Sequence, residues 1–169
     1  DIERVCFYHL VPSGRGSELV AVPHEDTRNA VRRILDRTAQ WAASGKPRAV
    51  LTVDQPVDGP YLYLRLMQEN PDRAAKVMEM LQWNGGGNNS SGTGIGNIDT
   101  QGNVHPDQFW QSLNLGNVKE RPFSEIWTNK QHALLDALRH RKEHITGRCK
   151  GCRFLDICDN GDLGLLQCR

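Results

Sequence analysis

Cysteines gather near one end of this sequence. Of the five cysteines in 169 residues, four lie within the last 21, at Cys149, Cys152, Cys158 and Cys168. The first two have C-x2-C spacing, and the glycine between them eases the bend that directs two thiolates at one metal centre. Zinc and iron–sulfur clusters both accept four thiolates. The spacing alone does not choose between them, although C-x2-C-x5-C is short for a zinc finger and lacks histidine partners.

The alternative is a set of unliganded or disulfide-bonded cysteines. A disulfide framework is normally spread over a small secreted domain, and the first residues show no secretory signal pattern. We therefore favour a metal site, whose negative charge the neighbouring Arg148, Lys150 and Arg153 would offset. Cys6 lies in an apolar run, which predicts a small buried hydrophobe and not a ligand.

Composition narrows the function classes. Hydrophobic residues make up 38% of the chain, charged residues 24%, and the formal net charge is +1. These values exclude a fully disordered chain and argue against a strongly basic nucleic-acid binder. No apolar run approaches the roughly 20 residues that a membrane span needs. We expect one ordinary domain or parts of two, with neither nucleic acid nor membrane as a partner.

The first half of the chain alternates predicted strands and helices. The expected elements are a strand over 5–11, a loop over 12–16, a helix over 25–43 ended by Gly45, a strand over 49–53, a loop over 56–60, and helices over 61–83 that break before Pro71. This order predicts parallel β/α units, in a small open sheet or as part of a barrel.

Three side chains follow the two predicted strands. His9 ends the first strand, Arg15 lies in the loop after it, and Asp54 closes the second. Ligands bind at this end of β/α barrels, so all three are candidate cofactor-binding residues. Arg15 could meet a carboxylate of a cofactor or substrate. The alternative for each is a turn or surface role.

The second half changes character after a Gly/Asn/Ser-rich segment, 84–94, which favours a linker over an anion-binding loop. A hairpin is expected around 99–102, an extended piece over 115–118, and a helix from an N-cap at Ser124 to about 144 that Gly147 terminates. Its expected inner face holds Ile126, Leu134, Leu135 and Leu138. The aromatic residues Phe109, Trp110 and Trp127 are expected in the core, and the basic run 139–142 at a solvated helix end.

Several strings together resemble a known family. They are His9–Gly16, Leu51–Asp54, Gly94–Asp99, Gly102–Trp110, Leu115–Val118, Pro122–Trp127 and the C-x2-C-x5-C segment. They resemble the C-terminal part of radical SAM enzymes with a SPASM-type extension, in the branch of haem d1 biosynthesis and the alternative haem pathway. Many SPASM domains place a cysteine where this chain has Asp107, which could approach a cluster or cap a turn. His105 could contact cluster or substrate, or be structural.

The resemblance implies an α/β fold in two parts. Residues 1–83 would form the last β/α units of a partial TIM-like barrel, and 84–169 a small α+β SPASM-type domain. It implies an auxiliary [4Fe–4S] cluster on Cys149, Cys152 and Cys158, with Cys168 as the fourth candidate. The complete enzyme would add S-adenosylmethionine and a second [4Fe–4S] cluster. The C-x3-C-x2-C motif that holds this second cluster is absent here, so we expect a fragment that is inactive alone.

The resemblance also implies a cytoplasmic enzyme that modifies tetrapyrrole side chains by propionate removal. Its partners would be a tetrapyrrole substrate and an electron donor such as ferredoxin or flavodoxin. Two alternatives stay open. One is a zinc-stabilised interaction module without catalysis, and the other is a SPASM maturase with a peptide substrate.

Overall fold

The computed structural model describes residues 2–10, 16, 18–84 and 90–158. The chain divides into two compact units. The first comprises 1–87 with 156–161, and the second comprises 88–155 with 162–169. The division after Gly87 falls inside the Gly/Asn/Ser-rich segment. Each unit is described by itself.

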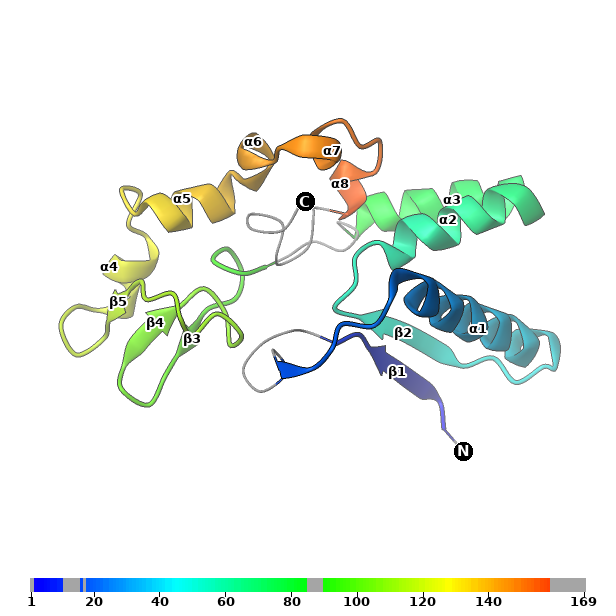
Figure 1. Cartoon of the computed structure of the whole chain (residues 1–169), viewed down its shortest axis with the longest axis horizontal. Coiled ribbons are helices and arrows are strands. Elements are labelled where there is room, and N and C mark those ends of the chain that lie inside the picture. The colour runs from blue at the N-terminus through cyan, green and yellow to red at the C-terminus, as the bar shows by residue number, and fades with distance from the viewer. Residues whose placement is uncertain (1, 11–15, 17, 85–89, 159–169) are drawn as a thin grey trace. The chain divides into compact units, whose positions relative to one another are not determined.

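The first unit is built on a β-α-β arrangement (Figure 1). Its elements are β1 (Arg4–Tyr8), α1 (His24–Ala43), β2 (Ala49–Val53), α2 (Asp58–Glu69) and α3 (Pro71–Trp83). Strands β1 and β2 pair in parallel, with Val5 opposite Val50 and Cys6 opposite Leu51. The expected parallel pairing is confirmed. The described residues form this two-stranded sheet and no closed barrel.

Local sequence accounts for the helix boundaries of the first unit. Gly45, with φ 71°, follows the end of α1 in the left-handed conformation that glycine adopts without strain. Asn70 separates α2 from α3, and its Oδ1 accepts the Arg73 N–H at 3.0 Å, while Pro71 opens α3. The expected break before Pro71 is confirmed. The loop predicted over 56–60 is shorter than expected, because a proline is tolerated in the first turn and α2 begins at Asp58.

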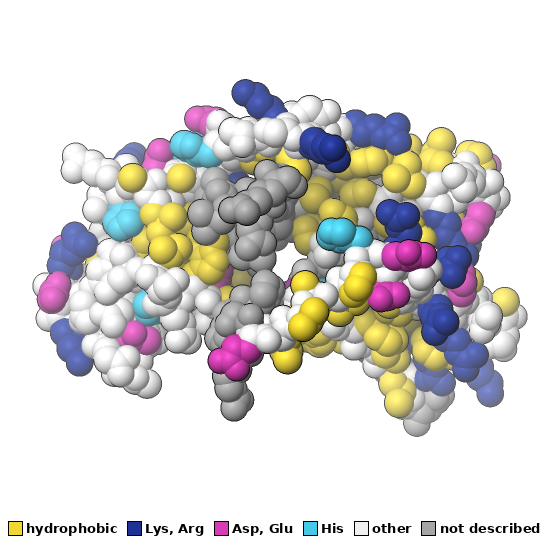
Figure 2. Space-filling view, viewed as in Figure 1, with side chains coloured by type: hydrophobic (Ala, Val, Ile, Leu, Met, Phe, Trp, Pro, Cys, Tyr) yellow, Lys and Arg dark blue, Asp and Glu magenta, His cyan; other side chains and the backbone are white. Residues whose placement is uncertain are grey.

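The strand pair is covered unevenly. Val5 and Val50 are half-buried, whereas Cys6 and Leu51, which alternate with them along the strands, are exposed. The prediction that Cys6 is a buried hydrophobe is therefore wrong, because the apolar run did not show which face of the sheet this residue occupies. Helix α1 is amphipathic, with Val31 buried and arginines such as Arg28 and Arg32 exposed. Dark blue basic side chains are visible over this part of the unit (Figure 2).

The second unit combines very short strands with short helices. Strands β3 (Asn97–Ile98), β4 (Asn103–His105) and β5 (Gly116–Asn117) form an antiparallel sheet in the order β3-β4-β5. The hairpin and the extended piece are confirmed. The helices are α4 (Phe123–Trp127), α5 (Ala133–Arg139), α6 (Arg141–His144) and α7 (Gly147–Lys150). Helix α8 (Leu155–Cys158), whose last three residues belong to the first unit, ends the described residues.

The single helix expected from Ser124 to about 144 is wrong. Pro122 precedes α4, and Ser124 lies inside it, where its carbonyl accepts the Thr128 hydroxyl at 2.6 Å. Asn129 Oδ1 then accepts the Gln131 N–H at 3.0 Å, which gives the backbone a local partner outside a helix. Gly147 does not end this helix either, since it opens α7 with φ 64°.

A small apolar core holds the second unit. Its buried members are Val104, Leu115, Ile126 and Leu135, with Val118, Trp127 and Leu134 packed against them. The expected inner face of the helical region is confirmed, although it is divided between α4 and α5. Phe109 is exposed, contrary to expectation.

The basic run 139–142 is not simply a solvated helix end. Arg139 donates to Trp127 O at 2.5 Å and to Gly92 O at 3.3 Å. Arg141 is buried, and its Nε donates to Leu138 O. Among the described residues, no helix is both long and apolar enough to span a membrane.

Gly96 packs against the ring of Trp127, and this contact leads to a prediction about packing. A Cβ at Gly96 would meet Trp127 ring atoms at 2.7 and 2.9 Å, and this ring also stacks on Phe123. We expect Gly96→Ala to lower the free energy of unfolding by about 1–3 kcal/mol in urea titrations. Gly94→Ala is the matched control, because its nearest neighbour would be at 3.5 Å. Equal stability of the two variants would contradict this packing.

Candidate functional sites

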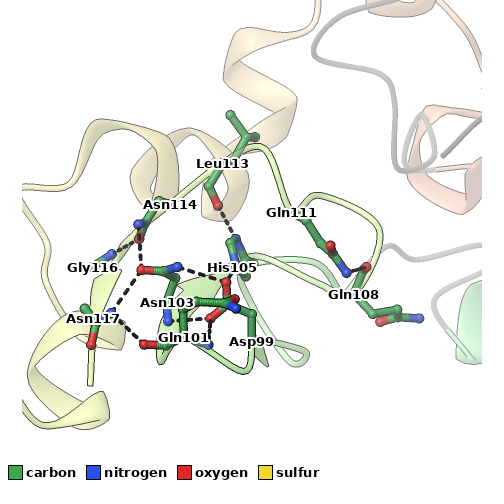
Figure 3. Close-up of polar contacts among 10 residues, drawn as sticks. All are labelled: Asp99, Gln101, Asn103, His105, Gln108, Gln111, Leu113, Asn114, Gly116 and Asn117. Atoms are coloured by element: carbon green, nitrogen blue, oxygen red, sulfur yellow. Dashed lines mark hydrogen bonds and ion pairs between the residues drawn. The ribbon is translucent and has the colours of Figure 1, made fainter. Parts of the chain in front are cut away.

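Asp99 organises the hairpin between β3 and β4 (Figure 3). Its Oδ1 accepts the backbone N–H groups of Gln101 and Asn103 at 2.9 and 2.8 Å. Its Oδ2 accepts the Asn103 side-chain amide at 2.9 Å and lies 3.2 Å from His105 Nε2. The Asn103 side chain contributes most to lowering the pKa of Asp99 from 3.8 to about 2, with the backbone donors and His105 adding to the shift. The carboxylate is thus held as an anion by four donors.

The side chain of His105 is buried in the hairpin, and both of its ring nitrogens contact protein atoms. The residue is only 2% exposed, and its Nδ1 lies 2.7 Å from Leu113 O while its Nε2 faces Asp99. Both ring nitrogens are within hydrogen-bonding distance of protein oxygens, so neither is left for a ligand. The structure therefore supports the structural alternative for His105, and places the residue in the interior of the hairpin.

Asp107 caps the turn that follows β4. It is 4% exposed, and its Oδ1 accepts the backbone N–H groups of Phe109 and Trp110 at 2.6 and 2.9 Å. Its Oδ2 accepts the Ser91 hydroxyl at 2.5 Å. Of the two roles considered for Asp107, the turn cap is the one the structure shows. The contact with Ser91 also fixes the segment before β3 to the turn after β4.

The cysteine segment forms two short helical turns. Cys149 lies in α7, and Cys152 follows it, with the Cys152 N–H donating to Cys149 O at 3.0 Å. The Phe154 N–H points at Cys152 Sγ, with a nitrogen–sulfur distance of 3.5 Å. Cys152 is exposed, whereas Cys149 and Cys158 are half-buried.

The donor chemistry of this segment fits a thiolate-bound cluster. Backbone N–H groups directed at cysteine sulfur stabilise thiolate charge and help to set cluster potentials. The described residues contain no group of three His, Cys, Asp or Glu side chains already gathered around one point. Cys168 and Arg15 lie outside the described residues.

His9 and Asp54 lie at the carboxyl end of the β1–β2 sheet, as expected. His9 Nε2 is 2.9 Å from Asp58 Oδ2, a partner that the sequence analysis missed. Asp58 lies in the first turn of the helix that follows β2, and a carboxylate at this position in the sequence could have indicated a partner for His9. Asp54 is exposed and adopts φ 65°, in the left-handed region that only a few non-glycine residues occupy.

Comparison with known protein families finds a match within the second unit. Residues 92–153 match the SPASM family, an iron–sulfur cluster-binding domain. This part of the chain is similar to SPASM domains, and the match includes the C-x2-C pair.

Three curated relatives extend the resemblance. The chain is 51% identical over 163 residues to Fe-coproporphyrin III synthase of Methanosarcina barkeri, covering 94% of this chain and 40% of the relative. It is 34% identical over 160 residues to pre-heme d1 synthase of Dinoroseobacter shibae, covering 93% and 39%. A shorter match, 36% over 67 residues, joins it to AdoMet-dependent heme synthase of Nitratidesulfovibrio vulgaris, covering 40% and 17%.

These matches confirm the resemblance to SPASM-containing radical SAM proteins of haem biosynthesis. The chain spans about 40% of the length of the first two relatives. No solved structure matches it.

The Asp107 cap can be tested by comparing two substitutions. Asp107→Ala removes three hydrogen bonds at a position that is only 4% exposed, so we expect it to lower the free energy of unfolding by about 2–4 kcal/mol. Asp107→Asn keeps an acceptor for both backbone donors and an amide for Ser91, so its loss should stay below about 1.5 kcal/mol. Urea unfolding measures both. A ligand role would instead make the two variants lose bound iron alike.

Asp99 makes stability depend on acid pH. Because the pKa of Asp99 is lowered from 3.8 to about 2, its ionised form stabilises the fold at pH values above about 4. That contribution is lost as the pH falls through about 2. We expect the gap in urea midpoint between the metal-depleted chain and its Asp99→Asn variant to be constant near pH 5–6. It should shrink towards pH 2, and a constant gap down to pH 2 would refute the assignment.

Proposed function

We propose that Cys149, Cys152 and Cys158 are ligands of an auxiliary [4Fe–4S] cluster, with Cys168 as the fourth. The observation that carries this proposal is the SPASM match, which extends over the C-x2-C pair. The N–H directed at Cys152 Sγ and the neighbouring basic residues support it. Cys158 follows after five residues, beyond the matched range, and enters the proposal through its spacing.

The chain's own residues prepare this site in three ways. The turn from Cys149 to Cys152 brings two thiol-bearing residues into one helical turn. The Phe154 N–H provides a donor to the Cys152 sulfur. The Arg153 guanidinium, which would offset the negative charge of a cluster, lies 4.7 Å from the Phe154 ring centroid. When bound, the cluster would supply electron transfer or help to place the substrate. Asp107 and His105 are engaged within the hairpin and are not part of the ligand set.

We further propose that the chain acts as part of a radical SAM enzyme of haem biosynthesis. The names of the three relatives support a tetrapyrrole as substrate class, and the name AdoMet-dependent heme synthase supports S-adenosylmethionine as cosubstrate. In this proposal residues 1–83 supply the last β/α units of the barrel and 84–169 the cluster domain. A second [4Fe–4S] cluster and an electron donor such as ferredoxin or flavodoxin complete the system.

The finer reaction is removal of carboxylate-bearing side chains, and we propose propionate removal as in the haem d1 branch. Coproporphyrins bear propionates themselves. A product like that named for the Methanosarcina relative would therefore keep these groups. The mass of the product formed by a complete enzyme shows whether the propionates have been removed or kept.

Iron content tests the cluster. Anaerobic reconstitution of the full chain with iron and sulfide should give about four irons per chain and a broad absorbance near 400 nm. Cys149→Ser, Cys152→Ser and Cys158→Ser should each lower the iron content, because each removes a thiolate ligand. Cys6→Ser is the matched control and should leave it unchanged. Cys168→Ser reports on the fourth ligand.

Other outcomes would contradict the proposal. A colourless chain that holds one zinc would favour a zinc-stabilised interaction module. The reconstituted chain could instead take up iron but leave the absorbance spectrum of ferric coproporphyrin III unchanged. That result would keep the cluster assignment and contradict a tetrapyrrole ligand. A peptide substrate would then become the better proposal.

A further inference from the structure

The first unit contains a histidine–aspartate pair outside the cysteine segment. His9 Nε2 lies 2.9 Å from Asp58 Oδ2, and the two side chains are 17% and 11% exposed. The two residues are 49 positions apart in the sequence, so the tertiary fold brings them together. Neither residue is part of the apolar core, and His9 follows directly on β1 at the carboxyl end of the β1–β2 sheet.

Backbone hydrogen bonds fix both partners. The His9 N–H donates to Val53 O at 3.1 Å, which continues the parallel pairing one residue beyond β1. The Asp58 N–H donates to Gln55 O at 3.2 Å at the start of the twelve-residue helix α2. In open α/β sheets, ligands bind outside the carboxyl ends of the strands. The pair therefore lies at the edge where this architecture binds small molecules.

The hydrogen-bonding capacity of the ring is only half used. Nε2–H donates to the Asp58 carboxylate, which sets the orientation of the imidazole. Among the described residues, none hydrogen-bonds Nδ1. In a ring with a proton on each nitrogen, Nδ1–H is a donor that an external acceptor can use, and a carboxylate is its strongest partner among organic groups.

We propose that His9, oriented by Asp58, binds a carboxylate of an organic ligand at the carboxyl end of the β1–β2 sheet. This inference rests on the proposed function, which supplies two ligands that bear carboxylates. One is the tetrapyrrole with its acidic side chains, and the other is S-adenosylmethionine with its methionyl group. Asp58 is a positioning residue, because it contacts the imidazole and not the ligand.

Binding to the full chain tests the proposal with matched variants. Ferric coproporphyrin III is titrated by visible absorbance, next to its amide derivative in which all carboxylates are blocked, and S-adenosylmethionine is titrated by calorimetry. The test variants are His9→Gln and Asp58→Asn. The controls are His24→Gln, at the exposed start of α1, and Asp72→Asn, in the exposed first turn of α3.

We expect His9→Gln to weaken binding of one carboxylate ligand by about tenfold or more, the scale of one charge-assisted hydrogen bond. Asp58→Asn should give a smaller loss. Both controls should bind as the unmodified chain does. If the affected ligand is the porphyrin, all variants should bind its amide derivative alike, which a general loss of structure would not produce. The affected ligand identifies the source of the carboxylate.

Equal binding of both ligands by His9→Gln and the unmodified chain would overturn the inference and leave the proposed function standing. Failure of the unmodified chain to bind either ligand would overturn it together with the proposed ligands, while iron content still reports separately on the cluster. Thermal unfolding checks each variant, and if His9→Gln unfolds early, the comparison between Asp58→Asn and Asp72→Asn decides.

Discussion

Two carboxylates hold the second unit in shape, because its strands are too short to do so. Strands of two or three residues provide few ladder hydrogen bonds, and the core cluster has four buried members among the residues that the structure describes. Asp99 compensates within the hairpin, where it accepts from the backbone and side chain of Asn103. Asp107 compensates across 16 residues of chain, where it accepts the Ser91 hydroxyl. The second unit thus depends on these polar contacts as well as on apolar packing.

Because Asp107 is needed to hold the fold, it is not available as a cluster ligand. Asp107 stands where many SPASM domains have a cysteine, and its oxygens are used by Ser91 and two backbone donors. The thiols are confined to the segment after α6, apart from Cys6 in β1. The proposed cluster ligands and the residues that stabilise the hairpin are therefore different residues. In the first unit, the His9–Asp58 pair is a separate polar feature at the carboxyl end of a parallel sheet.

Helices and strands with regular apolar spacing and clear glycine or proline boundaries could be predicted from the sequence. Segments in which a side chain hydrogen-bonds to the nearby backbone could not. The helix over 25–43, the strand over 49–53 and the break before Pro71 all agree with the structure, because apolar spacing, Gly45 and Pro71 mark them. The region from Ser124 onward also has helical spacing. There, however, the Asn129 side chain bonds to the backbone of its own turn, and one expected helix becomes several.

By itself the sequence indicated a metal-binding cysteine segment and placed most of the regular elements of the first unit. Four clustered cysteines, the C-x2-C spacing and the family strings are properties of residue order, and they survive without coordinates. Only the tertiary structure decided which polar side chains meet. His9 meets Asp58 across 49 residues, and Cys6 is exposed because it points to the opposite face of the β1–β2 pair from the half-buried Val5. Such contacts depend on register and on the path of the chain between elements, which local residue patterns do not encode.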